Sequence, residues 1–153
     1  MKHIITSILL LNCYALHAQT QLGSDIDGEA ANDYSGRSVS INSAGDRVAI
    51  GAHYNDGTDS NAGHVRVYEY SNSSWTQLGS DIDGEAADDY SGKSVSINSA
   101  GDRVAIGAHW NDGNGAGAGH VRVYEYSNSS WSQLGSDIDG EVGGGINLAI
   151  QCL

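Results

Sequence analysis

Apolar and polar residues alternate along four short stretches in the first half of the chain, each bounded by clusters of Gly, Asn, Asp and Ser. The stretches are residues 38–42, 47–52, 64–70 and 75–82. Alternation with a period of two is typical of β-strands, and the bounding residues favour turns. In the second stretch the small residues Ala49 and Gly51 share one face, which leaves room for a neighbouring sheet to approach closely. The pattern predicts an all-β fold with four antiparallel strands in each unit.

This strand pattern occurs twice, because residues 76–131 repeat residues 20–75 without a gap. Only seven paired positions differ between the two copies, and a third copy starts at Ser132 and stops after Glu141. Self-similarity at a fixed period indicates a supersecondary unit that stacks on copies of itself, and four strands per unit are typical of a β-propeller blade. The predicted organisation is repeat 1 at 20–75, repeat 2 at 76–131, a partial repeat 3 at 132–141 and a non-repeating tail at 142–153.

Two blades and a fragment are too few to close a propeller, which needs roughly four to eight blades. We therefore predict an open or incomplete propeller. The abrupt end of the register after Glu141 indicates a truncated member of a longer repeat family. Self-association of several chains through the incomplete propeller edges is the alternative. Each repeat ends on one tryptophan, Trp75 or Trp131, and we expect its indole to be buried between blades.

Residues 1–18 have the features of a secretory signal peptide: a basic start, the apolar run Ile4–Leu11 and a small residue, Ala18, at the end. The apolar run is too short to span a membrane. Removal of this segment also removes Cys13 and leaves Cys152 alone in the tail, so we expect no intramolecular disulfide. The sequence thus predicts a protein that is secreted or held at the cell surface, with no membrane insertion after the signal is removed.

The composition is acidic and rich in glycine. The chain has 19 acidic and 7 basic residues, a formal net charge of −12, 21 glycines and no proline. No cluster of Lys and Arg occurs along it. Nucleic acids and anionic membrane surfaces both require a basic surface, so the charge excludes them as expected partners.

Each repeat contains three short motifs in a fixed order: YSGRSV or YSGKSV, then RVAIGAH, then AGHVRVYEY. Together they resemble the FG-GAP repeat of integrin α-subunit type β-propellers over residues 20–141, and they are also similar to tandem repeats in exported proteins of Bacteroidetes-type bacteria. The resemblance implies a propeller fold and a role in recognition. The matching positions are Tyr34, Gly36, Ser38, Val39, Gly51, Ala52, Gly63, Val65, Val67 and Tyr68, and in repeat 2 Tyr90, Gly92, Ser94, Val95, Gly107, Ala108, Gly119, Val121, Val123 and Tyr124.

The repeats depart from this family pattern at two places. His53 and His109 replace the proline of the second motif. The resemblance also implies a calcium loop between the first two motifs, but here residues 42–46 contain a single carboxylate. Calcium takes six to eight oxygen ligands, so we expect no calcium site in this loop.

The densest acidic segment precedes the first motif and occurs in both repeats. Alternate acids beside a glycine supply the first half of a calcium loop, but the full twelve-residue spacing is missing. A weak calcium site is one hypothesis for these residues, and an exposed acidic linker between blades is the other; otherwise we expect no cofactor. The candidate metal ligands are Asp25, Asp27, Glu29, Asp81, Asp83 and Glu85.

Four of the seven differences between the repeats fall in the loop that follows the second motif, beside the exchange of Tyr54 for Trp110. A loop that varies while the strands stay the same indicates a solvated tip, and ligand contacts commonly lie at such tips. Neutral drift explains the same variation. An exposed aromatic ring here can stack on a sugar, or it can cap the edge of the core. The candidate ligand-binding residues are Tyr54, Asp56, Asp59, Trp110 and Asp112.

No catalytic arrangement stands out in the sequence. The serines lie in turns, no G-x-S-x-G occurs, and the paired histidines lack the spacing and cysteines typical of zinc sites. We therefore expect a protein without enzymatic activity: an exported module that recognises or adheres to an extracellular protein or glycan. Two alternatives stay open, a truncated remnant without independent activity and a carbohydrate-active propeller enzyme.

Overall fold

The structure is a computed structural model, and it describes residues 19–141. The predicted signal peptide at 1–18 and the tail at 142–153, with Cys152, lie outside the described residues. Within residues 19–141 every regular element is a β-strand. No helix in this part of the chain is long and apolar enough to cross a membrane.

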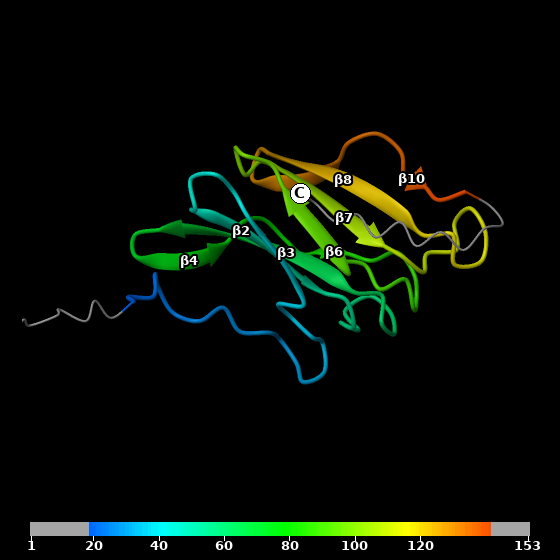
Figure 1. Ribbon diagram of the computed structural model, residues 1–153, viewed down its shortest axis with the longest axis horizontal. Helices are drawn as coiled ribbons and strands as arrows, with labels where there is room; N and C mark the ends of the chain where they lie inside the picture. Colours follow the sequence, from blue (N-terminus) through cyan, green and yellow to red (C-terminus); the bar gives the residue numbers. More distant parts are fainter. Residues whose placement is uncertain (1–18, 142–153) are drawn as a thin grey trace, which may run out of the picture.

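The strands form two separate antiparallel sheets, each with the order expected of a propeller blade (Figure 1). Blade 1 contains β1 (Ser38–Ile41), β2 (Arg47–Ala52), β3 (His64–Ser71), β4 (Ser74–Gln77) and β5 (Ile82–Asp83). Blade 2 contains β6 (Ser94–Ile97), β7 (Arg103–Ala108), β8 (His120–Ser127), β9 (Ser130–Gln133) and β10 (Ile138–Asp139). In both blades the first four strands pair in chain order, which confirms the predicted all-β, four-stranded arrangement.

The fourth strand differs from its prediction at 75–82. It divides into β4, which pairs with the second half of β3, and the two-residue β5, which pairs with the first half of the same strand. Gly79 lies between them with a φ of 77°, a left-handed conformation that favours glycine and turns the chain out of the strand. Each blade's fourth strand therefore crosses the repeat boundary, and its fifth strand comes from the beginning of the following repeat.

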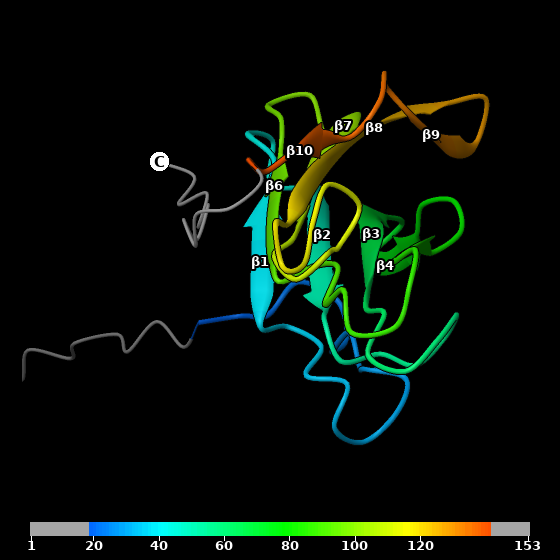
Figure 2. The same cartoon turned by 90° about the vertical axis from the view of Figure 1, so that its right-hand side faces the viewer.

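The blades stack with β6 lying alongside β1 and β2 (Figure 2). The apolar face of blade 2 buries the side chains of Val95, Ile97, Val104 and Ile106 against blade 1. On the blade 1 side the face is formed by small and β-branched residues, which are Ala49, Gly51, Val65 and Val67. This is the small-residue face that the alternation in β2 predicts.

Gly51 lies where the blades approach most closely. A Cβ atom built on Gly51 would be 2.1 Å from the carbonyl oxygen of Gly92, so no larger residue fits without a shift. Two hydrogen bonds join the blades at the same place: Ser38 Oγ donates to Gly92 O at 2.6 Å, and Ile97 N donates to Ser40 Oγ at 3.1 Å. Close backbone contact and polar pairing thus fix the register of one blade on the other.

The two sheets do not close into a ring, and one face of each blade is left without a covering sheet among the described residues. On blade 1 the open face exposes Val39 by 61% and Ile41 by 58%. The equivalent residues of blade 2, Val95 and Ile97, are 9% and 8% exposed because blade 1 covers them.

Both tryptophans are half-buried, so the prediction that their indoles are buried between blades is wrong. Trp131 packs against the core cluster with part of its indole exposed. Trp131 Nε1 donates to Leu78 O at 2.7 Å, and Trp75 Nε1 donates to Leu22 O at 2.8 Å. Each indole therefore ties the outer strand at the end of its repeat to the segment at the start of the same repeat.

Candidate functional site

The segments that lead into β1 and β6 meet the loops that follow β2 and β7, and buried asparagines hold them together. Asn55 Nδ2 donates to Asp33 Oδ2 at 2.8 Å, and in repeat 2 Asn111 Nδ2 donates to Asp89 Oδ2 at 2.9 Å. All four side chains are buried. The sequence did not single out these pairs. Nearly all polar residues recur in both repeats, so recurrence alone does not indicate which of them are buried. Their effect is to fix the loops that carry the aromatic residues.

Aromatic rings from these segments form a row that runs across both blades, which we call the aromatic strip. Its members are Tyr34, His53, Tyr54, Tyr90, His109 and Trp110. The ring centroids of Tyr34 and Tyr54 are 5.2 Å apart, and those of Tyr54 and Tyr90 are 5.1 Å apart. The row continues from Tyr90 to His109 at 5.8 Å and from there to Trp110 at 6.2 Å. Tilted and edge-on contacts at such distances are favourable for aromatic pairs.

Three rings of the aromatic strip are exposed to solvent. Tyr34 is 59%, Tyr54 is 38% and Trp110 is 58% exposed. Tyr34 and Tyr90 also have a φ of 55°, a left-handed conformation that is costly for a bulky residue. Backbone strain of this kind clusters at functional sites, where the surrounding structure holds the residue in place. The observed strain and exposure make the aromatic strip the strongest candidate for a binding surface.

His53 is a buried member of the aromatic strip and is 2% exposed. Its Nε2 lies 3.2 Å from Lys93 Nζ of the next blade, and since an ammonium group can only donate, the imidazole accepts there. Burial, together with the charges of Lys93 and Arg37, lowers the pKa of His53 to about 4. Burial and Lys93 also lower the pKa of His109. Both histidines are therefore neutral at pH 7, and His53 also accepts a hydrogen bond from Lys93.

The acids predicted to bind a ligand lie in the loops beside the aromatic strip, and each is engaged in its own turn. Asp56 Oδ1 accepts a hydrogen bond from Asn61 N at 2.7 Å, and Asp112 Oδ1 accepts one from Gly117 N at 2.6 Å. Asp59 Oδ1 accepts from the amide of the next residue at 2.8 Å. All three are exposed, so each retains oxygen lone pairs for a ligand.

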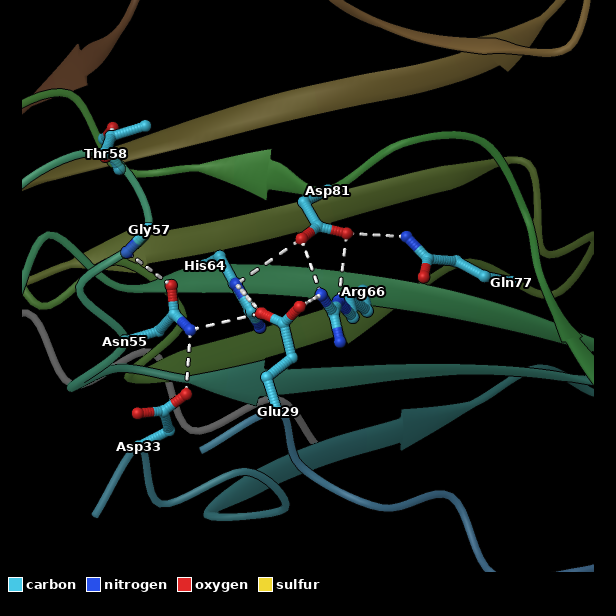
Figure 3. A network of polar contacts seen from close by, with 10 residues as sticks. Glu29, Asp33, Asn55, Gly57, Thr58, His64, Arg66, Gln77 and Asp81 are labelled. Atoms are coloured by element: carbon cyan, nitrogen blue, oxygen red, sulfur yellow. Dashed lines mark hydrogen bonds and ion pairs between the residues drawn. The ribbon is translucent and has the colours of Figure 1, made fainter. Parts of the chain in front are cut away.

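A second cluster gathers around the start of β3 (Figure 3). Arg66 donates to both carboxylate oxygens of Asp81, at 2.9 and 2.8 Å, and forms an ion pair with Glu29. His64 is buried, and its Nδ1 lies 3.9 Å from Glu29 and 3.8 Å from Asp81. The hydrogen bonds from Arg66 lower the pKa of Asp81, whereas burial lowers the pKa of His64 and raises that of Asp83.

The equivalent cluster in repeat 2 has the same residue types and different pairing. His120 Nδ1 lies 3.8 Å from Glu85 and 3.6 Å from Asp137, and it has no hydrogen-bond partner in the structure. Arg122 pairs with Glu85 at 3.3 Å and donates to Asp83 O at 2.8 Å, whereas in repeat 1 the equivalent Arg66 pairs with Asp81. Each repeat thus joins an acid from before the blade, a histidine at the start of its third strand and an acid from after the blade.

These two clusters are the groups of described residues whose oxygen and nitrogen atoms lie close enough to hold a metal ion. They combine Glu29 with Asp81, and Glu85 with Asp137, across the repeat boundary. Asp25 and Asp27 do not join either cluster; with Trp75 they line a shallow pocket of about 180 Å³. Because guanidinium groups already neutralise Asp81, Glu29 and Glu85, the clusters are best described as ion-pair networks, and calcium binding stays a prediction.

The turn at residues 42–46 is closed by its own side chains. Asn42 Oδ1 accepts from the amides of Asp46 and Arg47 at 3.1 and 3.0 Å, and Asn42 Nδ2 donates to Asp46 Oδ1 at 2.8 Å. The single carboxylate of this turn is therefore used internally to hold the β1–β2 connection.

Residues 25–68 match a family described as FG-GAP repeat, so the resemblance noted in the sequence is confirmed for this segment. The match starts in the acidic segment and ends within β3, and it includes the first half of the aromatic strip. No curated protein matches the chain.

Proposed function

We propose that this chain is an exported, non-catalytic recognition or adhesion module that binds an extracellular glycan or protein through the aromatic strip. The observation that carries the proposal is the row of exposed rings at Tyr34, Tyr54 and Trp110. Exposed apolar surface on a soluble protein is a frequent mark of an interaction site, and Tyr and Trp are enriched at the energetically dominant positions of binding surfaces.

The chemistry of the strip favours a glycan over a protein surface. Rings of Tyr and Trp combine a flat apolar face with a polar edge, which matches a sugar ring with its apolar C–H face and peripheral hydroxyls. Asp56 and Asp112 lie beside the rings with free acceptor capacity for those hydroxyls. The net charge of −12 favours a neutral polysaccharide over an anionic one.

A non-catalytic role is supported by the state of the acids. In repeat 1, Arg66 forms ion pairs with Glu29 and Asp81, the two carboxylates that lie near the buried His64. The guanidinium pairs with both carboxylates and lowers the pKa of Asp81, whereas hydrolysis of a glycosidic bond requires one carboxyl group that can deliver a proton. A carbohydrate-active enzyme remains the alternative, and release of reducing sugar by the purified protein would favour it.

Titration of the purified full chain with a soluble neutral β-glucan, monitored by isothermal titration calorimetry, tests the proposal. We expect saturable binding that weakens at least tenfold in Trp110→Ala and Tyr54→Ala. Ile138→Ala is the control, because Ile138 is 61% exposed and lies outside the strip. An anionic alginate and gelatin serve as comparison ligands. Binding of gelatin alone with the same Trp110 dependence would identify a protein ligand; no binding to any of the three would overturn the proposal.

A further inference from the structure

The interface between the blades pairs two different surfaces, each of which the repeat supplies twice. The donor face is the apolar side of the first two strands of a blade, and the acceptor face is the small-residue side of its second and third strands. In the interface, the donor face of blade 2 contributes Val95 and Ile97, and the acceptor face of blade 1 contributes Ala49 and Val65. Blade 1 therefore has a second donor face, and blade 2 has a second acceptor face.

Both of these second faces are uncovered by the described residues. Val39 and Ile41, on the donor face of blade 1, are more than half exposed. On the acceptor face of blade 2, a Cβ on Gly107 would meet only Ser94, whereas the same atom on Gly51 would meet the backbone of Gly92. The space that blade 2 fills over blade 1 is therefore not filled over blade 2 by any of residues 19–141.

An arginine on the open face of blade 2 lacks, among the described residues, a hydrogen bond that its equivalent forms across the internal interface. Inside the chain, Arg47 Nη1 donates to Gly101 O at 3.1 Å, across the interface, and its side chain is 23% exposed. The equivalent Arg103 pairs with Glu125 in its own blade and is 56% exposed. No described residue accepts from its Nη1, which is the atom that would reach Gly45 O of a second blade 1.

We propose that the acceptor face of blade 2 binds the donor face of blade 1 of a second copy of this chain, in the geometry of the internal interface. The two surfaces are complementary because each has the same strand sequence as a surface that is already paired. Such a head-to-tail contact is heterologous and generates a ring if the rotation closes. At roughly four to eight blades per propeller, the ring contains about two to four copies.

The contact would also extend the proposed binding surface, and this consequence rests on the proposed function. Tyr54 of blade 1 meets Tyr90 of blade 2 at 5.1 Å. Trp110 occupies the position of Tyr54 in repeat 2, so docking places it beside Tyr34 of the next copy. The aromatic strip then continues from one chain to the next, and a long ligand can contact several copies at once.

One segment must move for docking to occur. Residues 20–27 repeat as 132–139, and Leu22 lies on Trp75 as Leu78 lies on Trp131. The segment at residues 132–139, which completes blade 2, would therefore take the place of residues 20–27 of the incoming copy. Residues 20–27 form no strand, and Leu134 O can accept the hydrogen bond from Trp75 that Leu22 O loses. The exchange therefore replaces the hydrogen bond from Trp75 to Leu22 O with an equivalent hydrogen bond to Leu134 O of the other copy.

Sedimentation velocity on the purified full chain over a range of concentrations tests the assembly. We expect a monomer that converts into one discrete oligomer of two to four copies. The double variant V39E/I41E places charge on the donor face of blade 1, which is exposed in the free chain, and should weaken association at least tenfold without lowering the thermal midpoint. A wild-type chain that stays monomeric, or an oligomer that survives in V39E/I41E, would overturn the proposal.

Mixing two blocked chains tests the head-to-tail polarity. Ala105→Glu blocks the acceptor face of blade 2, and Val121→Glu is the substitute if Ala105→Glu unfolds, as judged by circular dichroism. Each blocked chain should be monomeric by itself, whereas V39E/I41E mixed with Ala105→Glu should form a one-to-one dimer through the remaining intact faces. Absence of that dimer would contradict the polarity. Glycan binding by a blocked monomer would separate this proposal from the proposed function, because the internal strip of each chain stays intact.

Discussion

Strands β1 and β6 contain the same four residues, Ser-Val-Ser-Ile, and differ in what covers them. In β6 the side chains of Val95 and Ile97 are buried against blade 1, whereas in β1 Val39 and Ile41 are more than half exposed. The strands pair with their own second strands in the same register. Pairing within a blade is therefore local to the repeat, whereas burial depends on the neighbouring blade.

The comparison separates two sources of stability in one sequence. Backbone hydrogen bonds and strand propensity are the same in β1 and β6, so neither explains a difference in stability between the two blades. The apolar area removed from water differs, and burial of a side chain such as Ile contributes about 1.5–3 kcal/mol. Substitutions at equivalent positions of the two repeats measure this contribution directly, with each repeat as the control for the other.

The largest difference is expected between Ile97→Ala and Ile41→Ala. Ile97 lies in the core cluster, and its truncation leaves a cavity, so we expect a loss of about 3 kcal/mol in the free energy of unfolding. Ile41 is exposed, and its truncation should cost less than about 1 kcal/mol, mainly through strand propensity. Urea unfolding in dilute solution measures both. Equal losses would mean that the donor face of blade 1 is also buried.

A smaller difference is expected between the tryptophans. Trp131 packs against the core cluster beside Leu78, so Trp131→Ala should lower the free energy of unfolding by about 2 kcal/mol. Trp75 lies against Leu22, in a segment without strand pairing, and Trp75→Ala should cost about 1 kcal/mol. The same urea titrations decide the order, and a larger loss at Trp75 would show that the first segment is held more tightly than the contacts indicate.

Gly51→Ala and Gly107→Ala compare the two acceptor faces. The added methyl group at Gly51 would meet the fixed carbonyl of Gly92, so we expect a loss of about 1–2 kcal/mol. At Gly107 the nearest atom is Ser94 Oγ, which can rotate away, and we expect a change near zero. Thermal unfolding of both variants in dilute solution provides the measurement. A similar loss at Gly107 would indicate that its face is covered in solution.

The smallest effect concerns pH and the two histidines of the aromatic strip, of which His53 is buried and His109 is half-buried. The unfolded chain protonates a histidine below its ordinary pKa of 6.5, whereas folded His53 stays neutral down to about pH 4. Stability from this residue is therefore complete above pH 6.5 and is lost as the pH falls towards 4. His53→Gln should reduce the slope of stability against pH in this window more than His109→Gln does. Unchanged slopes would mean that neither imidazole is held neutral by the fold.

The positions of the strands follow from the sequence because alternation and turn residues act over a few neighbours. Residues 38–42, 47–52 and 64–70 form strands within one residue of the predicted bounds. The division of the fourth strand was missed, because the left-handed Gly79 interrupts an apolar and polar alternation that continues through Ile82.

The candidate site was only partly accessible from the sequence. The exposed Tyr54 and Trp110 were singled out by their place beside a variable loop, but Tyr34 and Tyr90 were assigned only to a fold motif. These tyrosines join the strip because the segments before β1 and β6 fold back onto the loops after β2 and β7. The sequence also indicated the acid clusters only in part. Glu29 and Asp81 meet although they lie in different repeats, and His64 belongs to the same group.

The sequence alone determined the repeat, the strands, the turn chemistry and the small-residue face of β2, because these depend on residue type and on the period of two. Only the tertiary structure decided which of two identical surfaces is buried and which partners Arg66 and Arg122 bind. It also decided that aromatic residues from four segments form one strip. Those properties depend on which neighbour lies against a surface, and identical repeats carry the same local information while having different neighbours.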